Sequence, residues 1–243
     1  MLSESDLIQH VVKFGIDVFP AIELPNERTR LNMFYEDAAA AYPKIFDKLT
    51  CGTGEFSVSM SGKGEGSSGP VFALTPRGPV FMFPLFAPQI GEVTLTADFV
   101  GLFNDLRQRF FSFVPGRKIL RVGMVRELLF GLSPDADLAH LLPKTEDFAS
   151  AHFVGGQYLA QYRDDLYNIR VTGKSGELEV QQRAPLGPVM ASRHQRVFIV
   201  AVDVNNHEIR PLDNADITNT IEKACSLWPE QLLSSLNRGS EES

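Results

Sequence analysis

A chain of 243 residues, of which 44% are hydrophobic and 22% charged, can bury a sizeable core, and this composition excludes intrinsic disorder as its default state. The formal net charge of −7 excludes nucleic-acid binding through overall positive charge, although local patches stay open. The two cysteines, Cys51 and Cys225, form no CxxC pair, so we expect free thiols in a reducing compartment, the cytoplasm. The longest apolar run, 197–202, is too short to span a bilayer, and we expect no membrane partner.

The first half of the chain predicts two helices among short strands. Apolar residues recur every three or four positions over 26–49, which indicates an amphipathic helix that Pro43 kinks or divides. Asp98 is a suitable N-cap for a second helix over 99–113, and Pro115 and Gly116 follow its end. The strands expected from alternation and turn residues are 13–23, 56–60, 71–74, 79–86, 92–97 and 119–129.

The second half is predicted to be mostly sheet. The expected strands are 153–162, 166–172, 177–183 and 196–204, after a short helix over 134–142 and before a terminal helix over 216–236. Strands clustered between a few helices are typical of an α+β fold in which long helices cover antiparallel sheets. We therefore expect one compact unit over 1–237 and a disordered tail over 238–243.

Two segments of the chain share the same order and spacing of a proline, a predicted helix and an aromatic residue followed by a second proline. Pro25 precedes a helix that reaches Tyr42 and a proline, and Pro211 precedes a helix that reaches Trp228 and a proline at the same spacing. The match is compatible with the chance alignment of two amphipathic helices or with an internal duplication. A duplication would give two pseudo-symmetric halves, 1–132 and 133–237, with Tyr42 and Trp228 in equivalent buried positions.

No motif indicates catalysis or a metal. The segment Gly64-Glu-Gly-Ser-Ser-Gly69 has the form GxGxxG, but a proline and a strand follow it, whereas a dinucleotide site needs a helix there. The five histidines are scattered, no GxSxG elbow is present, and Asp164-Asp165 has the composition of a turn. The sequence thus predicts no catalytic residue, metal or cofactor. A dispersed active site is left open.

One basic segment reverses the overall charge. Six cations fall in a stretch of the chain without an acidic residue: Arg107, Arg109, Arg117, Lys118, Arg121 and Arg126. They are either cations that complement a helix end or a surface that attracts phosphates. Arg126 and Asp203 also lie on otherwise apolar strand faces, which indicates a structural ion pair, a wet strand end or a polar site.

The order of these elements resembles a sporadically distributed family of uncharacterised bacterial proteins. The pieces that carry the resemblance are Ala41-Tyr-Pro43, the hairpin 72–81, the helix 99–113, the strand Arg121-Val-Gly-Met-Val-Arg126 and the late sheet. In that strand, Arg126-Glu-Leu128 stands where the family has Tyr-Ile-Asn. The resemblance implies the fold and no activity.

Three functions follow as hypotheses. The first is a non-enzymatic interaction or accessory protein of a bacterial system that binds a protein partner or self-associates. The second is a binder of an anionic ligand or nucleic acid through 107–126, with nucleic acid less favoured because of the net charge. The third is an enzyme with a dispersed active site.

Overall fold

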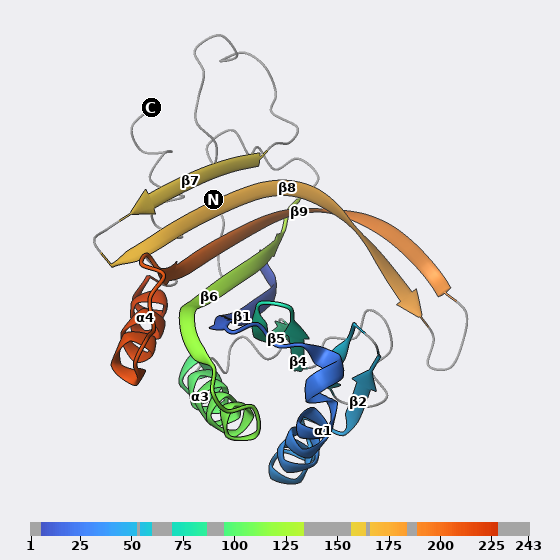
Figure 1. Ribbon diagram of the computed structural model, residues 1–243. Helices are drawn as coiled ribbons and strands as arrows, with labels where there is room; N and C mark the ends of the chain where they lie inside the picture. The colour runs from blue at the N-terminus through green and yellow to red at the C-terminus, as the bar shows by residue number, and fades with distance from the viewer. Residues whose placement is uncertain are drawn as a thin grey trace.

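The structure is a computed structural model in which residues 6–52, 54–59, 70–86, 95–133, 157–163, 166–183 and 189–227 are described (Figure 1). The glycine-rich loop, the expected helix 134–142, Trp228 and the tail 238–243 lie outside these residues. The helices are α1 (Leu24–Ala41), α3 (Leu95–Phe113) and α4 (Asn214–Ser226). The strands are β1 (Leu7–Phe19), β2 (Lys48–Cys51), β3 (Phe56–Ser59), β4 (Val71–Thr75), β5 (Gly78–Phe86), β6 (Lys118–Gly131), β7 (Gln157–Arg163), β8 (Tyr167–Arg183) and β9 (Val189–Asn206).

All strands in the described ranges belong to one antiparallel sheet of 9 strands in the order β2-β3-β4-β5-β1-β6-β9-β8-β7. The strand β1 lies at the centre, between β5 and β6, and two meanders extend the sheet on either side. The long strands β8 and β9 arch over the rest of the molecule in Figure 1. The protein is therefore dominated by a single sheet.

The expected pair of helix-covered sheets is wrong. Strand β6, in the first expected half, pairs with β9, in the second, from Gly123 opposite Asn205 to Gly131 opposite Val197. This continuous backbone pairing joins the halves 1–132 and 133–237 into one sheet. The three helices that the structure describes, of 18, 19 and 13 residues, share one core. Tyr42 is only half-buried, contrary to the duplication hypothesis.

Strand alternation creates two chemically different faces. Along β6, Val122, Met124, Arg126 and Leu128 are buried, whereas Gly123, Val125 and Glu127 between them are partly exposed. The helices pack on the buried face, which we call the inner face, and α4 contacts both β6 and β9 there. Phe34 of α1 and Phe110 of α3 are fully buried with the inner-face side chains. The opposite, outer face carries Arg121 of β6, Asn168 and Arg170 of β8, and Asp203 and Asn205 of β9.

No helix in the described ranges is long and apolar enough to cross a bilayer.

Candidate anion-binding site

Two cations of the basic segment are neutralised between helices. Arg109 forms ion pairs with Asp37 at 2.7 Å and Asp105 at 2.5 Å, which hold the pKa of Arg109 above its usual range. Arg117 pairs at 2.5 Å with Glu27, whose side chain is buried at the start of α1. These pairs tie α1 to α3 and to the turn that follows it. Arg109 and Arg117 therefore stabilise the helix layer and offer little free charge.

Three further cations do not share a surface with them. Arg107 and Arg126 are 7% and 3% exposed, and burial lowers the pKa of both, that of Arg126 to about 10. Arg107 donates to the Oδ1 of Asn214 at 3.2 Å and so connects α3 to the first turn of α4. Lys118 is exposed at the first position of β6. The basic segment is thus divided among the helix layer, the core and a strand end.

The buried Arg126 affects a neighbouring histidine. His10 of β1 is 2% exposed, and burial together with the charge of Arg126 lowers its pKa to about 3. The folded protein therefore keeps His10 neutral in mild acid, whereas an unfolded chain protonates it below its ordinary pKa of 6.5.

This difference in the pKa of His10 between the folded and unfolded chain predicts that the protein loses stability in mild acid. The stabilising contribution of a neutral His10 is complete above pH 6.5 and is lost as the pH falls toward 3. Between pH 6.5 and 5 we expect a loss of about 1.5 kcal/mol in the free energy of unfolding. Urea titrations at both pH values measure it, and His10→Gln, which does not titrate, should remove that part of the slope. An unchanged slope in the variant would contradict the assignment.

The two remaining sequence candidates, Arg121 and Asp203, are brought together on the outer face. Arg121 donates to the Oδ1 of Asn205 through Nε at 3.2 Å and Nη2 at 2.6 Å. Asn205, 6% exposed, in turn donates to Asp203 at 3.2 Å. Gly123 faces Asn205 across the strands, and a Cβ at this glycine would lie only 3.0 Å from the Cβ of Asn205. The small residue on β6 therefore leaves room for the amide that orients Arg121.

Strands β7 and β8 add two arginines that the sequence analysis did not single out. Asn168 stands opposite Asn205 and opposite Arg163, while Arg170 stands opposite Asp203. Residues paired in this way lie on the same face of a sheet. Arg121, Arg163 and Arg170 consequently line one hollow of about 410 Å³ on the outer face. We call it the arginine hollow.

The arginines of the hollow differ in what holds them. Arg121 is held by Asn205, and Arg163 donates to the ring of His207. Arg170 is exposed and makes no hydrogen bond or ion pair with any described residue. Among the described residues that line the hollow, Asp203 is the only carboxylate. Three cations against one anion give the arginine hollow a positive potential within an acidic protein.

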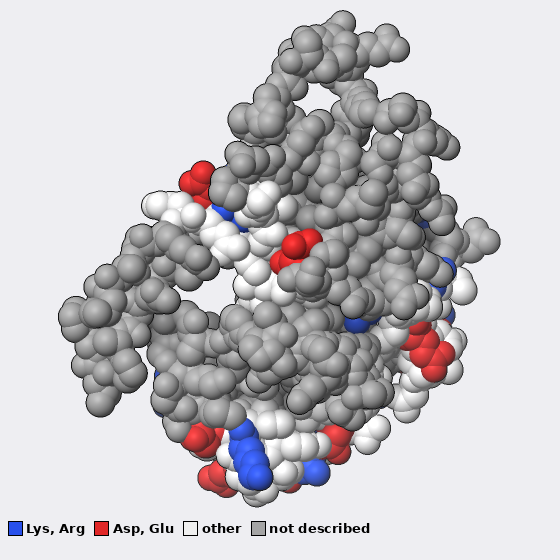
Figure 2. Space-filling model, turned by 180° about the vertical axis from the view of Figure 1, so that it is seen from behind, with Lys and Arg blue, Asp and Glu red and all other residues white. Residues whose placement is uncertain are grey.

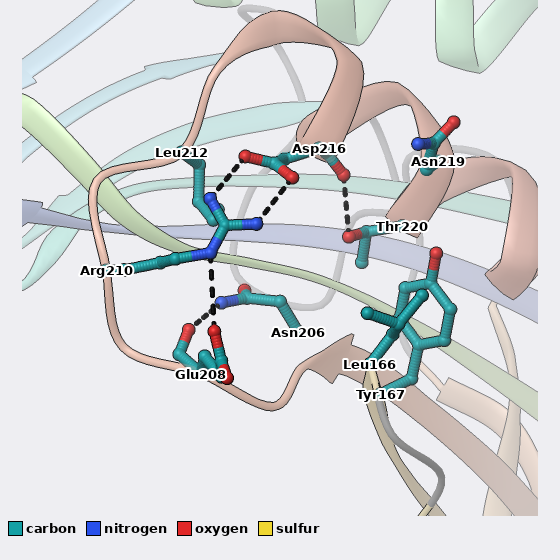
Figure 3. Close-up of a pocket in the computed structure, with 9 residues that line it drawn as sticks. All are labelled: Leu166, Tyr167, Asn206, Glu208, Arg210, Leu212, Asp216, Asn219 and Thr220. Carbon is teal, nitrogen blue, oxygen red and sulfur yellow. Dashed lines mark hydrogen bonds and ion pairs between the residues drawn. The ribbon is translucent and has the colours of Figure 1, made fainter.

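In a second, smaller hollow the charged side chains pair with one another (Figure 3). It encloses about 70 Å³ beside the first turn of α4, where both terminal nitrogens of Arg210 bind Asp216 at 2.7 Å. The Nε of Arg210 lies 3.4 Å from Glu208. The guanidinium of Arg210 is thus paired with a carboxylate on each side, and these ion pairs hold the segment after β9 against α4.

The face of the molecule seen from behind carries described side chains of both charges. Figure 2 shows the described basic side chains of the far side lying among acidic ones.

In comparisons with known proteins, no family model matches the chain, and no curated protein is significantly similar to it.

Proposed function

We propose that the protein is a non-enzymatic binding protein that receives an anionic group in the arginine hollow. The observation that carries the proposal is the guanidinium of Arg170, which has no partner among the described residues and lines the same hollow as Arg121 and Arg163. Guanidinium groups bind phosphate oxygens in a bidentate geometry and keep their charge at any physiological pH. The proposal places the protein in the cytoplasm, and the free thiols of Cys51 and Cys225 support this location.

The proposed anion-binding site differs from the one that the sequence predicts in the basic segment. Of the six cations in 107–126, only Arg121 belongs to the hollow, and the other two arginines come from 163 and 170. Asp203 is retained as the carboxylate of the site.

Titration with sodium tripolyphosphate in a calorimeter tests the proposal. The wild type should bind it, and Arg170→Ala should weaken binding at least tenfold, because one hydrogen-bonded charge contact contributes about 1.5–3 kcal/mol. Raising the salt concentration should weaken binding further. Arg28→Ala is the matched control, since Arg28 is an exposed arginine of α1 and lies in the helix layer. Equal affinities of wild type and Arg170→Ala, or no saturable binding at low salt, would refute the proposal.

A protein partner or self-association is a second candidate function. Strand β7 forms one edge of the sheet, and it carries Leu159 and Tyr162 with exposures of 51% and 59%. An edge strand with exposed apolar side chains can pair with another chain. Association through β7 would persist in Arg170→Ala, which separates it from anion binding.

A further inference from the structure

The two edges of the sheet differ in how they are protected. Within the described ranges β7 pairs only with β8, and its seven residues keep an unbroken register with that strand (Figure 1). The other edge, β2, has only four residues and begins with the exposed Lys48. Short edge strands and edge lysines are two of the features that keep a sheet from pairing with other chains. β2 has both of them, whereas β7 contains no lysine, proline or bulge.

The side chains of β7 favour burial of this edge. Leu159 and Tyr162 are 51% and 59% exposed and project on opposite faces of the strand. Arg163 is the only charged residue of β7 and occupies its last position. A partner strand would cover both apolar side chains and bury little charge.

The sequence of β7 is suited to pairing with a second copy of itself. In an antiparallel pair related by a two-fold axis through Ala160, all seven residues of one copy lie opposite residues of the other. Arg163 then lies opposite Gln157, so the two like charges do not meet. The small side chain of Ala160 lies opposite its own copy, where the two chains meet at the axis.

Other registers with the same symmetry are less complete. An axis at Leu159 pairs only 157–161, and an axis at Gln161 pairs only 159–163. The second of these also places the charge of Arg163 opposite the apolar Leu159. The register centred on Ala160 therefore pairs the most residues without an unfavourable contact.

We infer that two copies of the protein pair through β7, antiparallel and with Ala160 on the two-fold axis, so that one sheet runs through the dimer. This inference rests on the second candidate function and names its partner as a second copy of this chain. A two-fold interface is closed, so it covers both exposed edges without leading to open-ended aggregation. One strand per copy is a small interface, and we expect the dimer to dissociate on dilution.

The dimer would place two arginine hollows on one face. A two-fold axis perpendicular to the sheet keeps the outer faces of both copies on the same side. Arg170 stands opposite Gln161, which in the dimer stands opposite Leu159 of the second copy. Three strand spacings and two residues along the strand then separate the two copies of Arg170, which puts their Cα atoms roughly 16 Å apart. Both hollows consequently open toward the same polyanion or surface.

Sedimentation equilibrium of the full chain over a wide concentration range measures the association. Leu159→Lys combined with Gln161→Lys places lysine opposite lysine at two points of the dimer and should raise its dissociation constant at least tenfold. Leu159→Glu combined with Gln161→Glu should do the same. A mixture of the two double variants should dimerise again, because opposite charges then face each other across the axis.

Cysteine substitution tests the register independently. Opposite residues of an antiparallel pair have Cα atoms about 4.5–5.5 Å apart, which a disulfide can span. The two copies of Leu159 would be roughly 8 Å apart, which a disulfide cannot span. Under mild oxidation Ala160→Cys should form a covalent dimer, and Leu159→Cys should not. Arg28→Cys, at an exposed site of α1, controls for random collisions, and the wild type controls for the native thiols.

Three results would overturn the inference. These are a monomer at every concentration, equal cross-linking of Ala160→Cys and Arg28→Cys, and an undiminished dimer in the double lysine variant. Cross-linking of Leu159→Cys in place of Ala160→Cys would refute the register. A monomer that binds tripolyphosphate through Arg170 would leave the anion-binding proposal standing. A dimer that does not bind it would remove that proposal and leave this inference in place.

Discussion

Replacing Phe34 with alanine is expected to lower the free energy of unfolding by about 3–5 kcal/mol, the usual range for a large buried aromatic. Phe34 of α1 is fully buried, and its ring lies 4.8 Å from that of Phe72 and 5.4 Å from that of Phe110. It thus joins α1, β4 and α3 in one aromatic cluster. The substitution leaves a cavity at the contact of three elements, which cannot all move to fill it.

Urea denaturation followed by circular dichroism measures this loss. Met33→Ala is the matched control, because Met33 precedes Phe34 on the same helix and is 50% exposed. Its substitution should change stability by no more than about 0.5 kcal/mol. A similar small effect for Phe34→Ala would mean that α1 does not pack on the sheet.

A second large loss of stability is expected when Gly78, the first residue of β5, is replaced by alanine. Its φ of +151° is a conformation that residues with a side chain rarely adopt, and a Cβ there would lie 2.1 Å from the carbonyl oxygen of Ile16. Ile16 belongs to the central strand β1, whose position is fixed by pairing on both sides. Neither the backbone at Gly78 nor that at Ile16 can shift without breaking strand pairing. Gly78→Ala should therefore lower the free energy of unfolding by roughly 3 kcal/mol or more.

Gly15 provides the comparison for this substitution. It lies in β1 with no atom within 4 Å of an added Cβ and without a positive φ. Gly15→Ala should therefore change stability by less than about 1 kcal/mol in either direction. Thermal melts of both variants test the contrast, and equal melting temperatures would argue against the close approach of β5 to β1.

Much of the local structure could be predicted from the sequence, and the exceptions have physical causes. The hairpin around Thr75-Pro-Arg-Gly78 and the strand after Pro115-Gly116 follow from turn chemistry. The expected strand 92–97 is wrong in its last residues, since α3 already begins at Leu95. The expected break between 172 and 177 is also wrong, because β8 continues through Gly173 and Gly176 while pairing with β9. Cross-strand pairing here overrides a local glycine signal.

The helix expected over 26–49 shows a different limit. α1 ends at Ala41, just before the proline at 43, and β2 then begins at Lys48. The apolar residues after Pro43 continue the helical spacing, but Phe46 reaches the core from a turn rather than from a helix. Periodicity alone cannot distinguish these two ways of burying a phenylalanine.

The site was less predictable than the fold. Arg121 drew attention as part of the basic segment, and Asp203 because it lies on an apolar strand face. Nothing in the sequence, however, indicates that β9 lies between β6 and β8. Arg163 and Arg170 appear as ordinary polar positions of alternating strands. The only local signal is the alternation of Asn168 and Arg170 with apolar neighbours, which places both on one face without specifying which residues join them. The hollow is a product of strand order, which local patterns do not encode.

The central place of β1 in the sheet also has a consequence for folding during synthesis on the ribosome. Strand β1 precedes the other described strands in the chain, and it acquires its second neighbour only when β6 has been synthesised, since Val12 pairs with Arg126. Until then Val12, Phe14 and Ile16, all buried in the finished protein, belong to a strand with one open edge. Pairings between residues so distant in the chain are slow to form, typically over milliseconds to seconds. The nascent chain therefore passes through a period in which this apolar strand can pair with other chains, and chaperones that bind nascent chains can protect it.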